Sequence, residues 1–180
     1  MKRAVAKSAF TLVEMLVVLA IIGTLMAIIL PIVGKVKIAA KRAKAQQEIK
    51  SVELGIKAYQ SEYGKFPLQD SMTEHAYTAD YIDLMNTLAG VNTNANPRRI
   101  AFIELPQASM INNMFVDPWQ KPYQVVADWS MDNIVTLAAS NNYTPAALTG
   151  RVVAVWSFGP DGKGGSSPAN ANNDNLTSWK

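Results

Sequence analysis

The sequence contains no cysteine and a single histidine, His75, among its 180 residues. The lack of cysteine excludes a disulfide framework, a thiol nucleophile and any zinc or iron–sulfur centre with cysteine ligands. One histidine rules out a metal centre built from several histidines and disfavours a histidine-dependent catalytic triad. The sequence also lacks a Gly-x-Ser-x-Gly or phosphate-loop motif, so an enzyme is not favoured. We expect His75 to be a surface residue near Glu74.

The excess of basic residues is small and confined to the start of the chain. The formal net charge is +3, and Lys2, Arg3 and Lys7 precede the first apolar run. The 171 residues that follow residue 9 carry 14 basic and 14 acidic side chains. Because the basic excess disappears with nine residues, nucleic acid is not expected as a partner.

Charged residues are absent from Met15 to Val33, a run of nineteen mostly aliphatic residues. A helix of this length covers about 28 Å at 1.5 Å per residue, close to the thickness of about 30 Å of a bilayer's hydrocarbon core. The run is about twice as long as the apolar part of a secretory signal, which disfavours a removable signal peptide. The sequence therefore predicts a membrane-spanning helix.

The orientation of this helix is not decided by charge. Three basic residues precede the apolar run, and five follow it within a short distance. The positive-inside rule compares these counts, and here it leaves both orientations open. The five that follow are Lys35, Lys37, Lys41, Arg42 and Lys44.

Glu14 is the only charged residue within the extended apolar segment that begins at Phe10. A carboxylate inserted into lipid costs about 2.5–3.5 kcal/mol, so it requires a partner. The nearest preceding cation, Lys7, is seven positions away. Cleavage between Ala9 and Phe10 would create an α-ammonium group four residues before Glu14. The carboxylate then pairs with that amine, in its own chain or a neighbour's, or else lies shallow enough to reach the headgroups.

The segment Ser8–Glu14, which reads SAFTLVE, resembles the prepilin signal of type IV pilins and type II secretion pseudopilins. The resemblance implies that residues 1–9 form a cytoplasmic leader, that prepilin peptidase cleaves after Ala9, and that Phe10 becomes N-methylated. It also places residues after about 34 outside the cytoplasmic membrane. The family usually has glycine before the cleaved bond, and Ala9 is a small residue that suits the same site.

The residues after Gly34 predict a continuation of the helix. Proline is absent from residues 35–62, and one apolar stripe recurs at spacings of three and four. We expect a single helix from about residue 10 to 61, with residues 10–34 in the membrane and residues 35–63 amphipathic. Pro31, together with Gly23, predicts a kink because proline removes a helical hydrogen bond. The stripe consists of Ile49, Val52, Ile56, Tyr59 and Tyr63, whereas Lys41, Lys44, Glu48 and Lys57 lie off it.

Two short motifs after the helical stripe predict the end of the helix and a turn further along the chain. Gly64–Pro67 ends the helix, since glycine suits a left-handed cap and proline blocks continuation. Asp117–Tyr123 (DPWQKPY) predicts a turn in which Asp117 bonds forward to the backbone, with Trp119 and Tyr123 contributing to the core. Both motifs resemble those of major pseudopilins. In the second motif, that family usually has glycine where this chain has Gln120.

The remaining residues predict an α+β pilin fold with a globular head of residues 64–180. A short helix is expected at residues 79–89, and an antiparallel meander within residues 117–158 that packs on the apolar stripe. The three candidate strands are Tyr123–Ala127, Asn133–Leu137 and Arg151–Ser157.

Residues 159–180 form a glycine- and asparagine-rich tail that resembles the calcium loop of major pseudopilins. Ca²⁺ takes six to eight oxygen ligands, many of them carbonyls. The resemblance implies Asp161 and Asp174 as side-chain ligands and the Phe158 carbonyl as a third, with Asn173 and Asn175 as weaker candidates. The family often has two adjacent acidic residues where this chain has Asp174 and Asn175, which predicts weaker binding.

The resemblance implies a structural subunit and not an enzyme. Our first hypothesis is the major pseudopilin of a type II secretion system, anchored by one span in the inner membrane with its head in the periplasm, and assembling into a periplasmic filament. The implied partners are other copies of the chain, prepilin peptidase, minor pseudopilins, the inner-membrane assembly platform with its ATPase, and membrane lipid before assembly. A type IV pilin forming surface pili is the second hypothesis, and a membrane-anchored periplasmic enzyme the third.

Overall fold

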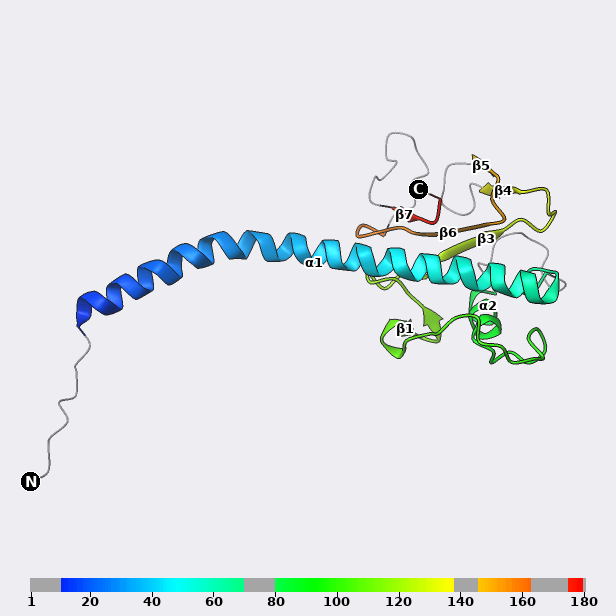
Figure 1. Cartoon of the computed structure of the whole chain (residues 1–180), viewed down its shortest axis with the longest axis horizontal. Helices are drawn as coiled ribbons and strands as arrows, with labels where there is room; N and C mark the ends of the chain where they lie inside the picture. Colours follow the sequence, from blue (N-terminus) through cyan, green and yellow to red (C-terminus); the bar gives the residue numbers. More distant parts are fainter. Residues whose placement is uncertain (1–10, 70–79, 138–145, 163–174, 180) are drawn as a thin grey trace, which may run out of the picture. The chain divides into compact units, whose positions relative to one another are not determined.

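The computed structural model describes residues 11–69, 80–137, 146–162 and 175–179. By its internal contacts the chain divides into two units, Met1–Ala40 and Lys41–Lys180. Helix α1 (Leu12–Tyr63) contributes to both units, and all the other elements belong to the second one (Figure 1). The long helix predicted from periodicity is therefore present, and its C-terminal half is part of the globular unit.

The second unit combines α1 with a short helix, a 3-10 turn and seven short strands among the described residues. The short helix was expected at residues 79–89 and is confirmed. The elements are α2 (Tyr81–Leu88), η1 (Gln107–Ser109), β1 (Met110–Ile111), β2 (Met114–Phe115), β3 (Gln124–Ala127), β4 (Ile134–Leu137), β5 (Ala146–Thr149), β6 (Val153–Ser157) and β7 (Leu176–Thr177).

The strands pair antiparallel, as expected, but the predicted meander is wrong. Strand β3 pairs with β6, with Val125 opposite Val155, and β6 pairs in turn with β7. Strand β4 pairs instead with β5, which the sequence reasoning did not anticipate. The second candidate strand thus belongs to a separate two-stranded ribbon inserted between the first and the third. Strand β7 also lies beyond the range expected for the sheet.

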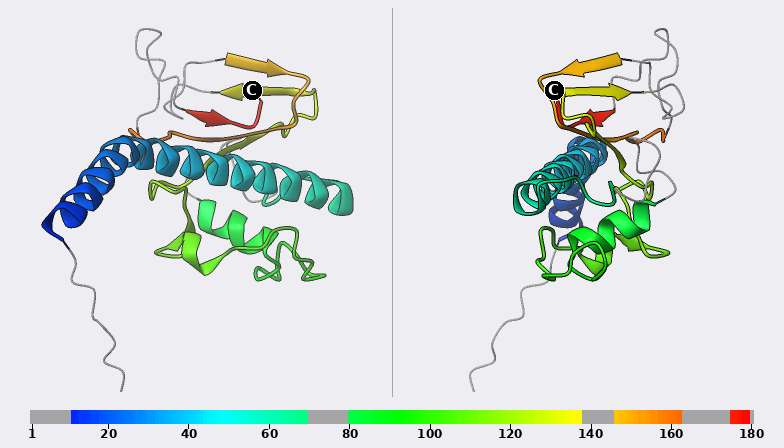
Figure 2. Two further views of the ribbon diagram at one scale, coloured as in Figure 1. Left: turned by 60° about the vertical axis from the view of Figure 1, so that its left-hand side comes forward. Right: turned by 90° about the vertical axis from the view of Figure 1, so that its right-hand side faces the viewer.

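The C-terminal half of α1 lies between two layers of the second unit. Strands β3 and β6 run along one side of the helix, and α2 and the β1–β2 ribbon lie on the opposite side (Figures 1 and 2). The apolar stripe contacts both layers: Ile49, Val52 and Ile56 are fully buried in one cluster with residues of α2, β3 and β6. The stripe therefore packs on the sheet, as predicted.

The strand pair β3–β6 is buried on both of its faces. Val125, Ala127, Val153 and Val155 belong to the cluster that includes the α1 stripe. The alternate residues belong to a second cluster, formed with the β4–β5 ribbon. This double burial explains why every residue of β6 is buried. The second cluster consists of Val126, Val135, Leu137, Ala154, Trp156 and Phe158.

The two predicted turns form, with one correction. Gly64 has φ of +71° directly after α1, and its N–H donates to the Gln60 carbonyl, so the expected left-handed cap is present. Asp117 Oδ1 accepts from the N–H groups of Trp119 and Lys121, each at 2.9 Å. Trp119 itself is only half-buried and belongs to neither core cluster, so its expected contribution to the core was wrong.

Candidate functional site

The first turn of α1 is closed by a reciprocal pair of residues, Thr11 and Glu14. Glu14 Oε2 accepts from the Thr11 backbone N–H at 2.8 Å and from its hydroxyl at 2.7 Å. The Glu14 N–H donates back to Thr11 Oγ1 at 3.3 Å. This is a capping box, and the Thr-x-x-Glu spacing that signals it was overlooked in the sequence reasoning. The Glu14 carboxylate therefore has local donors at the helix start.

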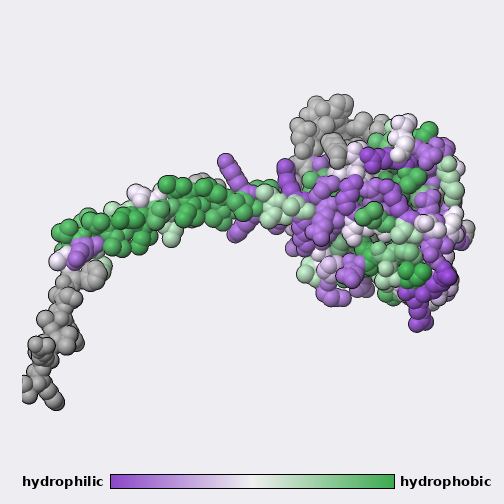
Figure 3. All heavy atoms as spheres, viewed as in Figure 1, coloured by the Kyte–Doolittle hydropathy of each residue, from purple (hydrophilic) through white to green (hydrophobic). Residues whose placement is uncertain are grey.

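After this first turn, the N-terminal part of α1 exposes its apolar side chains. Every residue from Leu12 to Leu30, and from Ile32 to Lys44, is exposed, with Leu12 at 80% and Leu30 at 70%. Figure 3 shows the N-terminal part of this stretch as a nearly continuous hydrophobic surface, followed by hydrophilic side chains. Burying one such aliphatic side chain is worth about 1.5–3 kcal/mol, so the segment requires lipid or protein around it. By length and composition α1 is able to cross a membrane.

The two residues expected to kink the helix, Gly23 and Pro31, both lie inside α1. The helix is continuous through both positions. An added Cβ at Gly23 would meet no atom within 4 Å, so the glycine is not required by packing. A bend at Pro31 stays a prediction.

Glu48 is buried, although it had been placed off the apolar stripe. It is 8% exposed, and its two oxygens accept from the Tyr123 hydroxyl at 2.5 Å and from Ser109 Oγ at 2.8 Å. Burial, together with the Glu48 carboxylate, raises the pKa of the Tyr123 hydroxyl, which therefore stays a donor. The position could have been found from its spacing, because Glu48 precedes Val52 by four residues.

A second acidic residue of α1, Glu53, is buried and pairs with the lysine that contacts the backbone after β7. Glu53 is 3% exposed and accepts from Lys50 at 2.9 Å and Lys57 at 2.7 Å, with Arg151 Nη1 at 4.0 Å. Lys50 also donates to the Ser178 carbonyl at 2.6 Å. Glu53 thus balances the charge of Lys50, the cation that connects the backbone after β7 to α1.

The expected calcium ligands are only partly within the described residues. Phe158 is buried, and Asp161 is exposed in a turn that includes Gly162, where φ is +63°. Asn173 and Asp174 lie outside the described residues, as do Ala9, Phe10 and His75. Asn175 is described: it is 9% exposed, and its Oδ1 has no hydrogen-bond partner in the described part of the chain. Among described residues no three His, Cys, Asp or Glu side chains gather as a metal site.

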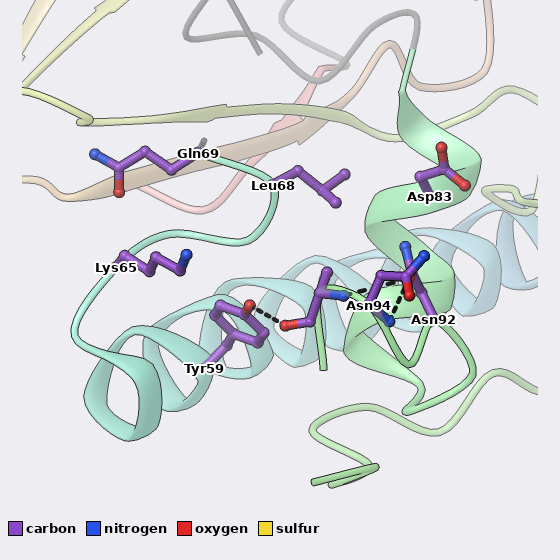
Figure 4. Close-up of a pocket in the computed structure, with 8 residues that line it drawn as sticks. Tyr59, Lys65, Leu68, Gln69, Asp83, Asn92 and Asn94 are labelled. Carbon is purple, nitrogen blue, oxygen red and sulfur yellow. Dashed lines mark hydrogen bonds between the residues drawn. The ribbon is translucent and has the colours of Figure 1, made fainter. Parts of the chain in front are cut away.

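A polar pocket of about 350 Å³ lies beside the C-terminal end of α1 (Figure 4). Two of its lining residues, Tyr59 and Ala95, are joined by a 2.6 Å hydrogen bond from the tyrosine hydroxyl to the Ala95 carbonyl. Asn92 Oδ1 accepts from the N–H groups of Asn94 and Ala95, which shapes the loop on one wall. The Tyr59 hydroxyl is thus engaged structurally. The described lining residues are Tyr59, Lys65, Leu68, Gln69, Asp83, Asn92, Asn94 and Ala95.

Comparison with known proteins identifies the N-terminal segment. Residues 6–30 match the family model described as the prokaryotic N-terminal methylation motif. The match indicates a prepilin-type signal like that of type IV pilins and pseudopilins, which implies processing by prepilin peptidase and pilus-like assembly. No curated protein and no solved structure matches the chain. The α+β structure, with a long apolar N-terminal helix packed on small antiparallel sheets, is consistent with a pilin fold, and the motif points to a structural subunit and not to an enzyme.

Proposed function

We propose that this protein is the major pseudopilin of a type II secretion system, a subunit that polymerises into a periplasmic filament. The observation that supports this most is the methylation motif at residues 6–30, which coincides with the uncovered apolar half of α1. A subunit that moves from the bilayer into a filament keeps this surface buried throughout, first by lipid and then by neighbouring helices.

Glu14 supports assembly over a simple membrane anchor. In this proposal, prepilin peptidase cleaves after Ala9 and leaves the methylated amine of Phe10 four residues before Glu14. The capping box does not prevent this pairing, because both Thr11 donors bind the same carboxylate oxygen, Oε2. The carboxylate would then pair with the amine of its own chain or of a neighbour in the filament core.

Two experiments test the proposal in sequence. Mass spectrometry of the native protein should find a mature chain that starts at N-methylated Phe10, whereas an intact leader would contradict every pilin-like function. Deletion of the gene should then abolish export of proteins across the outer membrane without removing surface pili. Loss of surface pili with normal export would instead favour the type IV pilin, which shares the same motif.

We also propose that the C-terminal tail binds Ca²⁺. The buried Asn175 Oδ1, which lacks a partner among described residues, fits the family's use of this tail, since Ca²⁺ accepts amide oxygens as ligands. The Phe158 carbonyl, Asp161, Asn173 and Asp174 would complete the oxygen donors. With no cysteine in the chain, a bound ion would fasten this tail where a disulfide is not possible.

A further inference from the structure

The stretch Lys35–Lys44 of α1 carries five basic side chains that the proposed function does not use. They are all exposed, and no aspartate or glutamate occurs between Glu14 and Glu48. In the described residues Lys44 is paired with Glu48 at 3.7 Å, and no ion pair involves the other four. We call these five residues the basic collar: Lys35, Lys37, Lys41, Arg42 and Lys44.

The spacing of the collar residues along the sequence distributes them around a helix. At about 100° per residue, the positions of Lys35 and Arg42 share one side of a regular helix, and those of Lys37, Lys41 and Lys44 share the other. An acidic partner protein would contact one side of the helix and leave cations on the other side unmatched. A layer of lipid headgroups surrounds a membrane helix on all sides, so it can neutralise the whole collar.

The position of the collar also favours lipid. It begins two residues after Val33, the last residue of the uncharged apolar run, so its side chains follow the hydrocarbon boundary directly. Removal of residues 1–9 would leave no lysine or arginine on the opposite side of that run. The processed chain would then carry all its membrane-proximal lysine and arginine residues on the outer side, against the usual positive-inside distribution. Negatively charged headgroups on that side would offset this imbalance.

We propose that the basic collar binds anionic phospholipid headgroups at the outer surface of the cytoplasmic membrane before the subunit assembles. This inference depends on the membrane-anchored stage of the proposed function. Each cation near an anionic surface changes partitioning by roughly fivefold at low salt, and the effect falls as salt shortens the Debye length. The collar would thereby hold the unassembled subunit at anionic lipid, and assembly would have to release it.

The test uses the full chain reconstituted in phosphatidylcholine vesicles that contain spin-labelled phosphatidylglycerol or spin-labelled phosphatidylcholine. Electron paramagnetic resonance measures the fraction of each labelled lipid that is immobilised by the protein. We expect a severalfold preference for phosphatidylglycerol at low salt, reduced at 0.5 M NaCl. The double variant K37Q/K41Q should lower this preference at least twofold. The charge-matched control R99Q/K121Q, which changes two exposed cations outside the collar, should leave it unchanged.

Equal immobilisation of the two lipids by the wild-type chain would overturn the inference, and so would equal losses in both double variants. If K37Q/K41Q keeps the lipid preference but fails to form filaments, the collar binds another copy of the chain and the lipid proposal is wrong. Resistance to alkaline extraction from the vesicles shows whether the chain is inserted in the bilayer, independently of its lipid preference. A chain that inserts without lipid preference contradicts only the collar proposal, whereas a chain that does not insert contradicts the proposed function as well.

Discussion

The Tyr123 hydroxyl donates a 2.5 Å hydrogen bond to Oε2 of Glu48, and both residues are buried. Tyr123 directly precedes β3, whereas Glu48 lies on α1, so the bond connects the sheet side of the second unit to the helix. Ser109, which ends the η1 turn before β1, donates to the other oxygen of the same carboxylate. One acidic side chain therefore connects three segments that are far apart in the sequence.

Replacing Tyr123 with Phe should destabilise the second unit by about 1–3 kcal/mol, because a buried carboxylate loses a donor that water cannot replace. Urea denaturation of the full chain in detergent would measure the change. Tyr63→Phe is the control: its hydroxyl donates to Asn96 Oδ1 and the residue is only half-buried, so we expect a smaller loss. Equal losses of stability in the two variants would show that leaving the buried Glu48 carboxylate without this donor costs no more than leaving Asn96 without the Tyr63 donor.

Glu14→Ala should leave membrane insertion intact and abolish incorporation into filaments, because the variant has no carboxylate to pair with the Phe10 amine. Membrane fractionation and electron microscopy of sheared filaments would measure both outcomes. Thr11→Ala is the matched control, since it removes the hydroxyl of the capping box, at a cost of about 1 kcal/mol, and keeps the charge. Normal filaments from Glu14→Ala would contradict the pairing, and loss of filaments from Thr11→Ala would assign the effect to the helix cap.

The stability of the second unit should depend on the ionisation of Glu53. Burial raises the pKa of this carboxyl, but the hydrogen bonds and charges of Lys57 and Lys50 outweigh burial and leave its pKa below the ordinary value. A depressed folded-state pKa contributes stability that is present above the unfolded-state pKa, about 4.3, and is lost as the pH falls through the folded-state value. Glu53→Gln should therefore lower the melting temperature at pH 7, and the difference from wild type should shrink below about pH 4. A difference that stays constant across this range would refute the role of the charge.

Asp161→Ala should lower the melting temperature more in the presence of Ca²⁺ than in EDTA, since the carboxylate is expected to bind the ion. Differential scanning calorimetry of the full chain in detergent would measure both. Asp132→Ala provides a control on an exposed aspartate outside the tail, and its effect should be independent of Ca²⁺. Equal shifts of the melting temperature for Asp161→Ala with and without Ca²⁺ would contradict calcium binding by Asp161.

Gln120→Gly should stabilise the turn after Asp117. Gln120 has φ of +68°, a left-handed conformation that costs a residue with a side chain about 1–2 kcal/mol, whereas glycine adopts it freely. Part of the gain is offset by the greater flexibility of glycine in the unfolded chain, so we expect a net increase of about 0.5–1 kcal/mol. Thermal unfolding would measure it. Asn113→Gly at φ of +62° should gain less, because asparagine tolerates this conformation.

Several features of the fold followed from local sequence patterns. The uncharged run after Glu14 predicted a helix that is stable in an apolar environment. The three- and four-residue spacing from Ile49 to Tyr63 predicted a buried stripe on the same helix. Gly64 and Asp117 also behaved as their residue types predict, since a left-handed cap and a forward-bonding aspartate depend on neighbours within a few residues.

Strand pairing could not be predicted in the same way. The meander failed because alternation identifies a strand without identifying its partner, and Ala146–Thr149 was not recognised as the partner of β4. Inserting the β4–β5 ribbon covered the second face of β3 and β6, so β6 became buried at every residue and lost the alternating pattern of a one-sided strand.

The amino-acid sequence by itself determined that this protein has a prepilin-type N-terminus, an apolar helix suited to a membrane or a filament core, and an amphipathic continuation. Each of these depends on composition and on spacing along one helix. Only the tertiary structure decided that the Glu48 carboxylate accepts from Tyr123 and Ser109, and that Glu53 is buried beside Lys50, which donates to the Ser178 carbonyl. The two donors of Glu48 are far from it in the sequence, so their meeting at one buried carboxylate depends on the fold as a whole.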